Sequence, residues 1–148
     1  MEQDSTSMLM NVLKSANKED ISKYQTDHLF VGRTGFCAYM DALILEKRLK
    51  RRGIFQKADI PQKYGYKLLS GESHTSNRDK LLRIFIAMNM TLKEIQRALA
   101  LYDMPVLYPK RKRDAIIIIA INKGVSSVDI VNEWLVEQGE TELSRIED

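Results

Sequence analysis

Apolar residues recur at helical spacing along most of the chain. In residues 36–50 they lie three or four positions apart, which places them on one face of a helix. These residues are Phe36, Tyr39, Met40, Leu43, Ile44 and Leu49. Residues 8–15 and 18–30 show the same pattern, and residues 31–35 form a break with two glycines. We therefore expect helices over 8–15, 18–30 and 36–50.

Capping signals predict the bounds of four later helices. Pro61 suits the first turn of a helix, so we expect short helices over 51–58 and 61–70, joined by a tight turn. Ser76 with Asp79, and Thr91 with Glu94, have the spacing of a capping box. These boxes predict a helix over 78–88 and another from 91 to about 102.

The segment DAIIIIAIN, residues 114–122, has two interpretations. Its β-branched residues are typical of a buried strand. However, no second convincing strand accompanies it, and a lone strand leaves its backbone unpaired. We therefore predict a buried helix that ends at Gly124. A last helix is expected between Ser126 or Ser127 and Gly139, which makes the expected fold class all-α.

Charge is segregated along the chain. The 148 residues include 23 basic and 20 acidic side chains, a net charge of +3. Residues 35–113 hold 17 basic and 7 acidic side chains, a net charge of +10, whereas residues 114–148 hold 2 and 8, a net charge of −6. A basic domain of this size is typical of proteins that bind polyanions. Solvated helix faces are the alternative explanation.

The sequence offers no catalytic or metal-binding constellation. His28 and His74 lie far apart, Cys37 sits among apolar residues as a buried thiol does, and no nucleophile, base and orienting group occur together. We therefore predict no enzyme activity, no cofactor and no metal. The longest apolar run, residues 115–121, is too short for a membrane span. The start MEQDSTS is unlike a signal peptide, so we expect a cytoplasmic protein.

Three stretches carry a resemblance to a known family: YGYKLLSG, SNRDKLL and LYPKRKRDAIIIIA. The chain resembles the lambda-repressor-like (Cro/cI, or XRE) helix-turn-helix transcriptional regulators, and more narrowly a divergent Clostridia-type branch of them. The core of the resemblance covers about residues 36–102. It implies a five-helix DNA-binding domain whose third helix enters the major groove of double-stranded DNA. We accordingly divide the chain into an N-terminal helical extension (1–34), a helix-turn-helix domain (35–104) and a C-terminal helical pair packed on that domain (105–148).

The resemblance also implies which residues contact DNA. The recognition helix, about residues 61–70, supplies the base-contacting candidates, because glutamine can bond adenine and lysine can bond guanine. These candidates are Gln62, Lys63, Tyr64 and Lys67. Arg51, Arg52 and Arg78 are the phosphate-contacting candidates. For Arg78, an ion pair with Asp79 is the alternative.

The basic run at residues 110–113, KRKR, has two interpretations as well. It is either a phosphate-contacting arm or the start of a helix whose charges pair with Asp114 and nearby acids. A cationic helix N-terminus is unfavourable for the helix dipole, and this calls for a partner of opposite charge.

Three positions depart from the pattern of the family. Phe55 stands where most members have a small residue, Asp59 replaces the turn glycine, and Gly65 replaces an aliphatic residue. We hypothesise that Phe55 and Gly65 form a paired swap, in which the ring fills the space that the missing side chain leaves. Asp59 tolerates a left-handed backbone better than most residues.

Two functions are compatible with these residues. The first is a sequence-specific DNA-binding regulator, expected to act as a homodimer because paired half-sites multiply specificity. The C-terminal and N-terminal helices are the candidate dimerisation elements. The second is a protein-interaction module, or an antitoxin-like partner of another protein, that keeps the fold without specific DNA contacts.

Overall fold

The computed structural model describes residues 33–145. These belong to one compact unit, which spans Gly32–Asp148. The helices expected over 8–15 and 18–30 lie outside the described residues.

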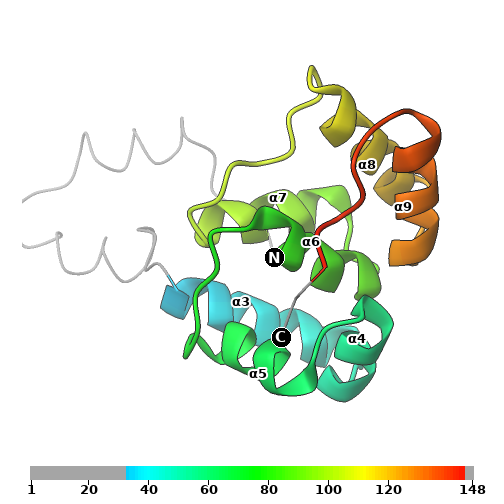
Figure 1. Ribbon diagram of the computed structural model, residues 1–148. Coiled ribbons are helices and arrows are strands. Elements are labelled where there is room, and N and C mark those ends of the chain that lie inside the picture. Colours follow the sequence, from blue (N-terminus) through cyan, green and yellow to red (C-terminus); the bar gives the residue numbers. More distant parts are fainter. Residues whose placement is uncertain (1–32, 146–148) are drawn as a thin grey trace, which may run out of the picture. The chain divides into compact units, whose positions relative to one another are not determined.

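The regular structure of residues 33–145 is entirely helical, with seven helices and no strand (Figure 1). The helices are α3 (Arg33–Glu46), α4 (Arg51–Ala58), α5 (Gln62–Ser70), α6 (Arg78–Ala87), α7 (Leu92–Leu101), α8 (Lys112–Asn122) and α9 (Val128–Glu137). The prediction of an all-α protein is thus confirmed for this part of the chain. The isoleucine-rich segment forms α8. In this helix the backbone N–H and C=O groups bond to each other, so no partner strand is required.

Helix ends agree with the sequence at some positions and differ at others. The bounds of α4 are as predicted, and α5 begins one residue late because Pro61, with ψ 130°, stands just before it. The prediction for residues 36–50 was wrong at both ends, because α3 begins at Arg33 and stops at Glu46. Arg48 adopts a left-handed conformation (φ 56°), and the amide of Leu49 bonds to the carbonyl of Ile44 at 3.0 Å. This bond closes the end of α3.

Two of the predicted caps are confirmed and one is corrected. Thr91 and Glu94 form a complete capping box before α7, and Ser127 caps α9. Before α6, however, the cap is Asn77, whose side chain accepts from the amide of Asp79 at 3.0 Å. The Ser76 box does not form, since the carboxylate of Asp79 binds other partners.

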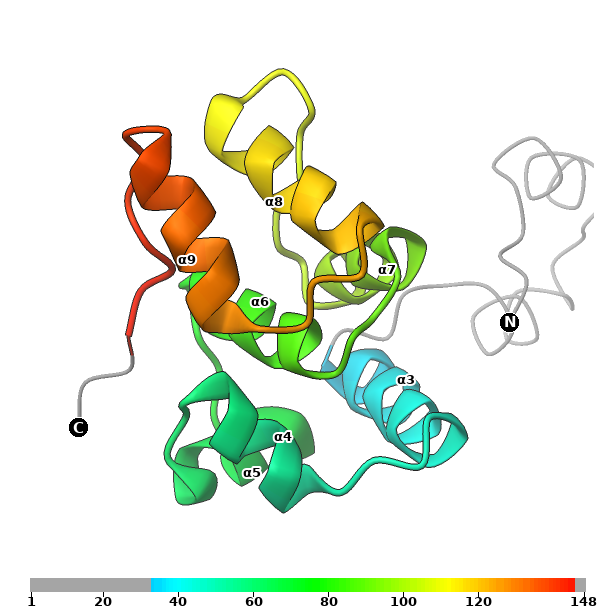
Figure 2. The same ribbon diagram turned by 90° about the vertical axis from the view of Figure 1, so that its right-hand side faces the viewer.

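Helix α6 lies at the centre of the seven described helices. Every residue from 81 to 88 is buried, including Arg83, and the helix packs against α4, α7 and α9. Figure 2 shows α4 and α5 on one side of α6, with α8 and α9 on the other. The apolar core is continuous across all seven helices, so the α4–α5 pair packs on the same core as the other helices.

Candidate nucleic-acid interface

A three-residue turn sets the angle between α4 and α5. Asp59 adopts the left-handed conformation (φ 56°, ψ 52°), as its chemistry led us to expect. The amide of Ile60 donates to the carbonyl of Phe55 at 2.9 Å, and the Ile60 side chain is buried. Pro61 then leads directly into α5. The two short helices are therefore fixed against each other at their junction.

The predicted contact between Phe55 and Gly65 is confirmed. Three ring atoms of Phe55 lie 2.5 to 2.7 Å from the position that a Cβ at Gly65 would take, so a side chain there would overlap the ring. Phe55 is fully buried, and Tyr66 packs edge-on against it with ring centroids 5.1 Å apart. Helix α5 thus approaches α4 more closely than any side chain at position 65 would permit.

The outer face of α5 carries polar and cationic side chains. Gln62 and Lys63 are exposed at its first turn, while Tyr64 and Lys67 are half-buried. The ammonium of Lys80 lies over the ring of Tyr64, 5.4 Å from its centroid. Helix α5 contains no acidic residue, so these four base-contacting candidates share a helix without a competing carboxylate.

The segment leading into α4 adds further positive charge. Residues 48–67 hold seven basic side chains and one acidic side chain, Asp59. Arg52 is exposed, as are Arg48 and Lys50. Arg51 differs from them because its guanidinium forms an ion pair with Asp41 of α3. Of the two phosphate-contacting candidates on α4, Arg52 is therefore the freer one.

The third phosphate-contacting candidate, Arg78, binds partners inside the protein. Its guanidinium bonds both carboxylate oxygens of Asp114, at 2.5 and 3.2 Å. It also donates to the carbonyls of Pro105 and Val106, each at 3.3 Å. The alternative of an ion pair with Asp79 was wrong, because neighbouring side chains on a helix do not face each other. With these partners Arg78 ties α6 to α8.

Asp79 instead pairs with Arg113, which completes a reciprocal arrangement of two Arg-Asp dipeptides. The guanidinium of Arg113 bonds both oxygens of Asp79, at 3.0 and 2.9 Å. Burial raises the pKa of Asp79, but the hydrogen bonds from Arg113 and Ser144 outweigh it and hold this pKa below its ordinary value. Within the run 110–113, Arg113 therefore forms an ion pair with an acidic residue, as one of the two interpretations expected. Its partner is Asp79 and not Asp114.

Sequence reasoning missed a structural link through Arg83, which connects the end of α4 to the segment after α9. This buried side chain donates to the carbonyl of Ala58, at the end of α4, at 3.1 Å. It also donates to the carbonyls of Leu143 and Ser144, at 2.9 and 2.7 Å. Burial lowers the pKa of Arg83, and the nearby Asp59 opposes that effect. One arginine inside the apolar run LLRIFIAM was the available signal, since arginine is rarely buried without partners.

The described residues contain neither a membrane-spanning helix nor a metal-binding cluster. No helix between residues 33 and 145 is long and apolar enough to cross a bilayer. In the same range, no three His, Cys, Asp or Glu side chains gather as metal ligands.

Comparisons with protein-family models, with curated proteins and with solved structures gave no match. The resemblance to lambda-repressor-like regulators thus stays a prediction from the sequence.

Proposed function

We propose that this protein is a cytoplasmic, sequence-specific DNA-binding transcriptional regulator in which α3–α7 form a lambda-repressor-like helix-turn-helix domain. Helix α5 is the recognition helix and enters the major groove of double-stranded DNA. The observation that carries the proposal is the acid-free outer face of α5, held at a fixed angle to α4 by the Asp59 turn.

The first turn of α5 would contact base edges. Gln62 is exposed there and has the amide that bonds adenine through two hydrogen bonds. Lys63 has the donor that guanine accepts. Lys67 lies one helical turn beyond Lys63, on the same face. Tyr64 offers its ring edge to a thymine methyl or its hydroxyl to a phosphate.

Phosphates would be contacted from the start of α4. Arg52 carries this role, supported by Arg48 and Lys50, all of which are exposed. Arg51 would contribute less to these contacts, because its ion pair with Asp41 offsets part of its positive charge. We leave Arg78 out of the proposed interface, because Asp114 and two carbonyls occupy its guanidinium.

Binding of fluorescent duplex DNA across a salt series tests the phosphate contacts. The logarithm of the association constant should fall linearly with the logarithm of the salt concentration. Arg52→Ala should make that slope shallower by about one unit. Lys93→Ala, which removes an exposed lysine from α7, is the matched control and should leave the slope unchanged. Binding that does not respond to salt would contradict the proposal.

A protein-interaction module, or an antitoxin-like partner, is the second candidate function. Tyr66 favours it, because this aromatic side chain is 45% exposed on α5 and exposed tyrosines are enriched at protein interfaces. Under this alternative, Tyr66→Ala would abolish capture of the partner while duplex DNA binding stayed weak and independent of sequence.

A further inference from the structure

The two tyrosines of α5 lie in different surroundings. Tyr64 is half-buried and packs against the apolar core, and the ammonium of Lys80 lies 5.4 Å from the centroid of its ring. Tyr66, in contrast, is 45% exposed. Of the two residues, Tyr66 therefore presents the larger ring surface to a molecule that lies against α5.

Tyr66 shares a face of α5 with two of the proposed base contacts. It follows Gln62 by four residues and Lys63 by three, and residues at these intervals lie next to each other on a helix. Gln62 and Lys63 are both exposed. A base pair in contact with either of them would therefore have Tyr66 close by, about one helical turn further along α5.

The ring of Tyr66 is supported from the side of α4. It packs edge-on against Phe55, with ring centroids 5.1 Å apart and ring planes at 74°. Phe55 is itself fully buried, in the space that the missing side chain of Gly65 leaves open. Because Tyr66 is already held by this contact, less side-chain freedom is lost when a ligand packs against its ring. The side chain is therefore suited to one defined contact.

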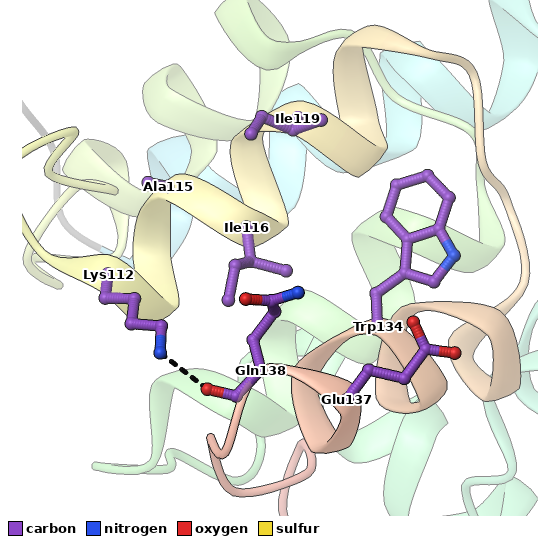
Figure 3. A pocket seen from close by; sticks show the side chains of 7 residues that line it. All are labelled: Lys112, Ala115, Ile116, Ile119, Trp134, Glu137 and Gln138. Atoms are coloured by element: carbon purple, nitrogen blue, oxygen red, sulfur yellow. Dashed lines mark hydrogen bonds between the residues drawn. The ribbon is translucent and has the colours of Figure 1, made fainter.

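The charges around α5 favour a nucleic acid as the molecule that Tyr66 contacts. The helix holds two lysines and no acidic residue, and the nearest acids in sequence, Asp59 and Glu72, lie before and after it. A different aromatic residue, Trp134, lines the cleft of about 380 Å³ between α8 and α9 (Figure 3). One basic and one acidic side chain line that cleft, Lys112 and Glu137, so it lacks the excess of positive charge that attracts phosphates.

The major groove offers one apolar group to a ring of this kind, the C5-methyl group of thymine. We propose that Tyr66 is a specificity-determining residue, whose ring packs on the methyl group of a thymine beside the base pairs that Gln62 and Lys63 contact. This inference rests on the proposed function, since it requires α5 to lie in the major groove. It leaves the phosphate contact to the hydroxyl group of Tyr64.

Replacement of thymine by deoxyuridine tests this contact, because deoxyuridine forms the same base pair without the methyl group. The probe is the duplex motif that the wild type enriches from a random library, with its thymines replaced one at a time. For the wild type, one replacement should weaken binding about fourfold, which is the effect of one buried methyl group. Tyr66→Phe keeps the ring and should keep this effect. Tyr66→Ala should bind the two duplexes with equal affinity.

Tyr108→Ala is the matched control, since Tyr108 is 48% exposed in the loop before α8 and its loss should leave the methyl effect unchanged. Circular dichroism should show that the variants keep the helical fold. The inference would be overturned, with the proposed function still standing, by an enriched motif in which no thymine responds to deoxyuridine, or by a response that survives Tyr66→Ala. A wild type that enriches no motif would contradict the proposed function itself.

Discussion

The ring of Phe55 lies in the space that the side chain of residue 65 would otherwise occupy. Its nearest ring atoms are 2.5 to 2.7 Å from where a Cβ on Gly65 would stand. A large residue on α4 and a missing side chain on α5 thus form one packing unit. Because α5 carries the proposed base contacts, this unit also determines how far α5 stands out from the protein.

Gly65→Ile should destabilise the protein by about 1–3 kcal/mol, because the core around Phe55 has no room for the added atoms. In a Phe55→Leu background the same substitution should cost less, since the two positions share one space. Chemical denaturation of the four proteins in this cycle measures the coupling. A Gly65→Ile variant as stable as the wild type would contradict the packing argument.

Gly53→Ala is the control for this cycle. It adds a Cβ to α4 where nothing lies within 4 Å. Alanine restricts the unfolded chain and favours helix, so Gly53→Ala should stabilise the protein by about 0.5–1 kcal/mol. The opposite signs at the two glycines separate a steric effect from helix propensity.

Asp79 should make the stability of the protein depend on acidic pH. Its pKa is lower in the folded protein than in the unfolded chain, so its ionised form stabilises the fold above the ordinary pKa of 3.8. That contribution is lost as the pH falls below about 4 and through the folded value. Asp79→Asn should therefore cost about 2 kcal/mol at pH 7, and the difference from wild type should shrink towards pH 3.

The free energy of unfolding of both proteins, measured between pH 7 and pH 3, checks this expectation. Asp103→Asn is the control, since Asp103 is exposed and asparagine also accepts its left-handed backbone (φ 61°). If the loss of stability caused by Asp79→Asn stays constant down to pH 3, the negative charge of Asp79 does not stabilise the fold through its ion pair with Arg113.

Arg83→Met should loosen the segment after α9. The amide of Leu143 donates to Asn132 at 2.8 Å and that of Ser144 to Asp79 at 3.0 Å. Arg83 holds the carbonyls of the same two residues. Without the Arg83 guanidinium, the exchange of these two amide hydrogens should accelerate about tenfold or more. The amides in the core of α9 should accelerate less.

Hydrogen exchange followed by NMR gives the residue-specific rates for this comparison. Arg111→Met, which alters an exposed arginine near α8, should leave the rates at Leu143 and Ser144 unchanged. Equal acceleration throughout α9 and the terminal segment would instead mean that Arg83 acts on the stability of the whole fold.

Local chemistry made α4 and its junction with α5 predictable. The preference of Asp59 for a left-handed backbone and the fixed φ of Pro61 act within a few residues. The departures from the family pattern at Phe55 and Gly65 then predicted that these two residues, ten positions apart, are in contact. These features need little information about the rest of the fold.

The reciprocal ion pairs were beyond such reasoning. Arg78 and Asp114 are 36 residues apart in sequence, and Asp79 and Arg113 are 34 apart. Each arginine stands next to an aspartate that it does not bind. Which distant acid it meets depends on where α8 is placed relative to α6, and this placement depends on the packing of the whole core. The choice of Asn77 over Ser76 as a cap follows from the same cause, because Asp79 has turned towards Arg113.

Selection of binding sites from a random duplex DNA library tests the central claim most directly. The wild type should enrich a defined motif, and two copies in palindromic order if it binds as a dimer. Gln62→Ala and Lys67→Ala should each relax the preference at one or two positions of that motif while other positions persist. An unenriched library, retained only weakly and lost as the salt concentration rises, would contradict sequence-specific DNA binding by this protein.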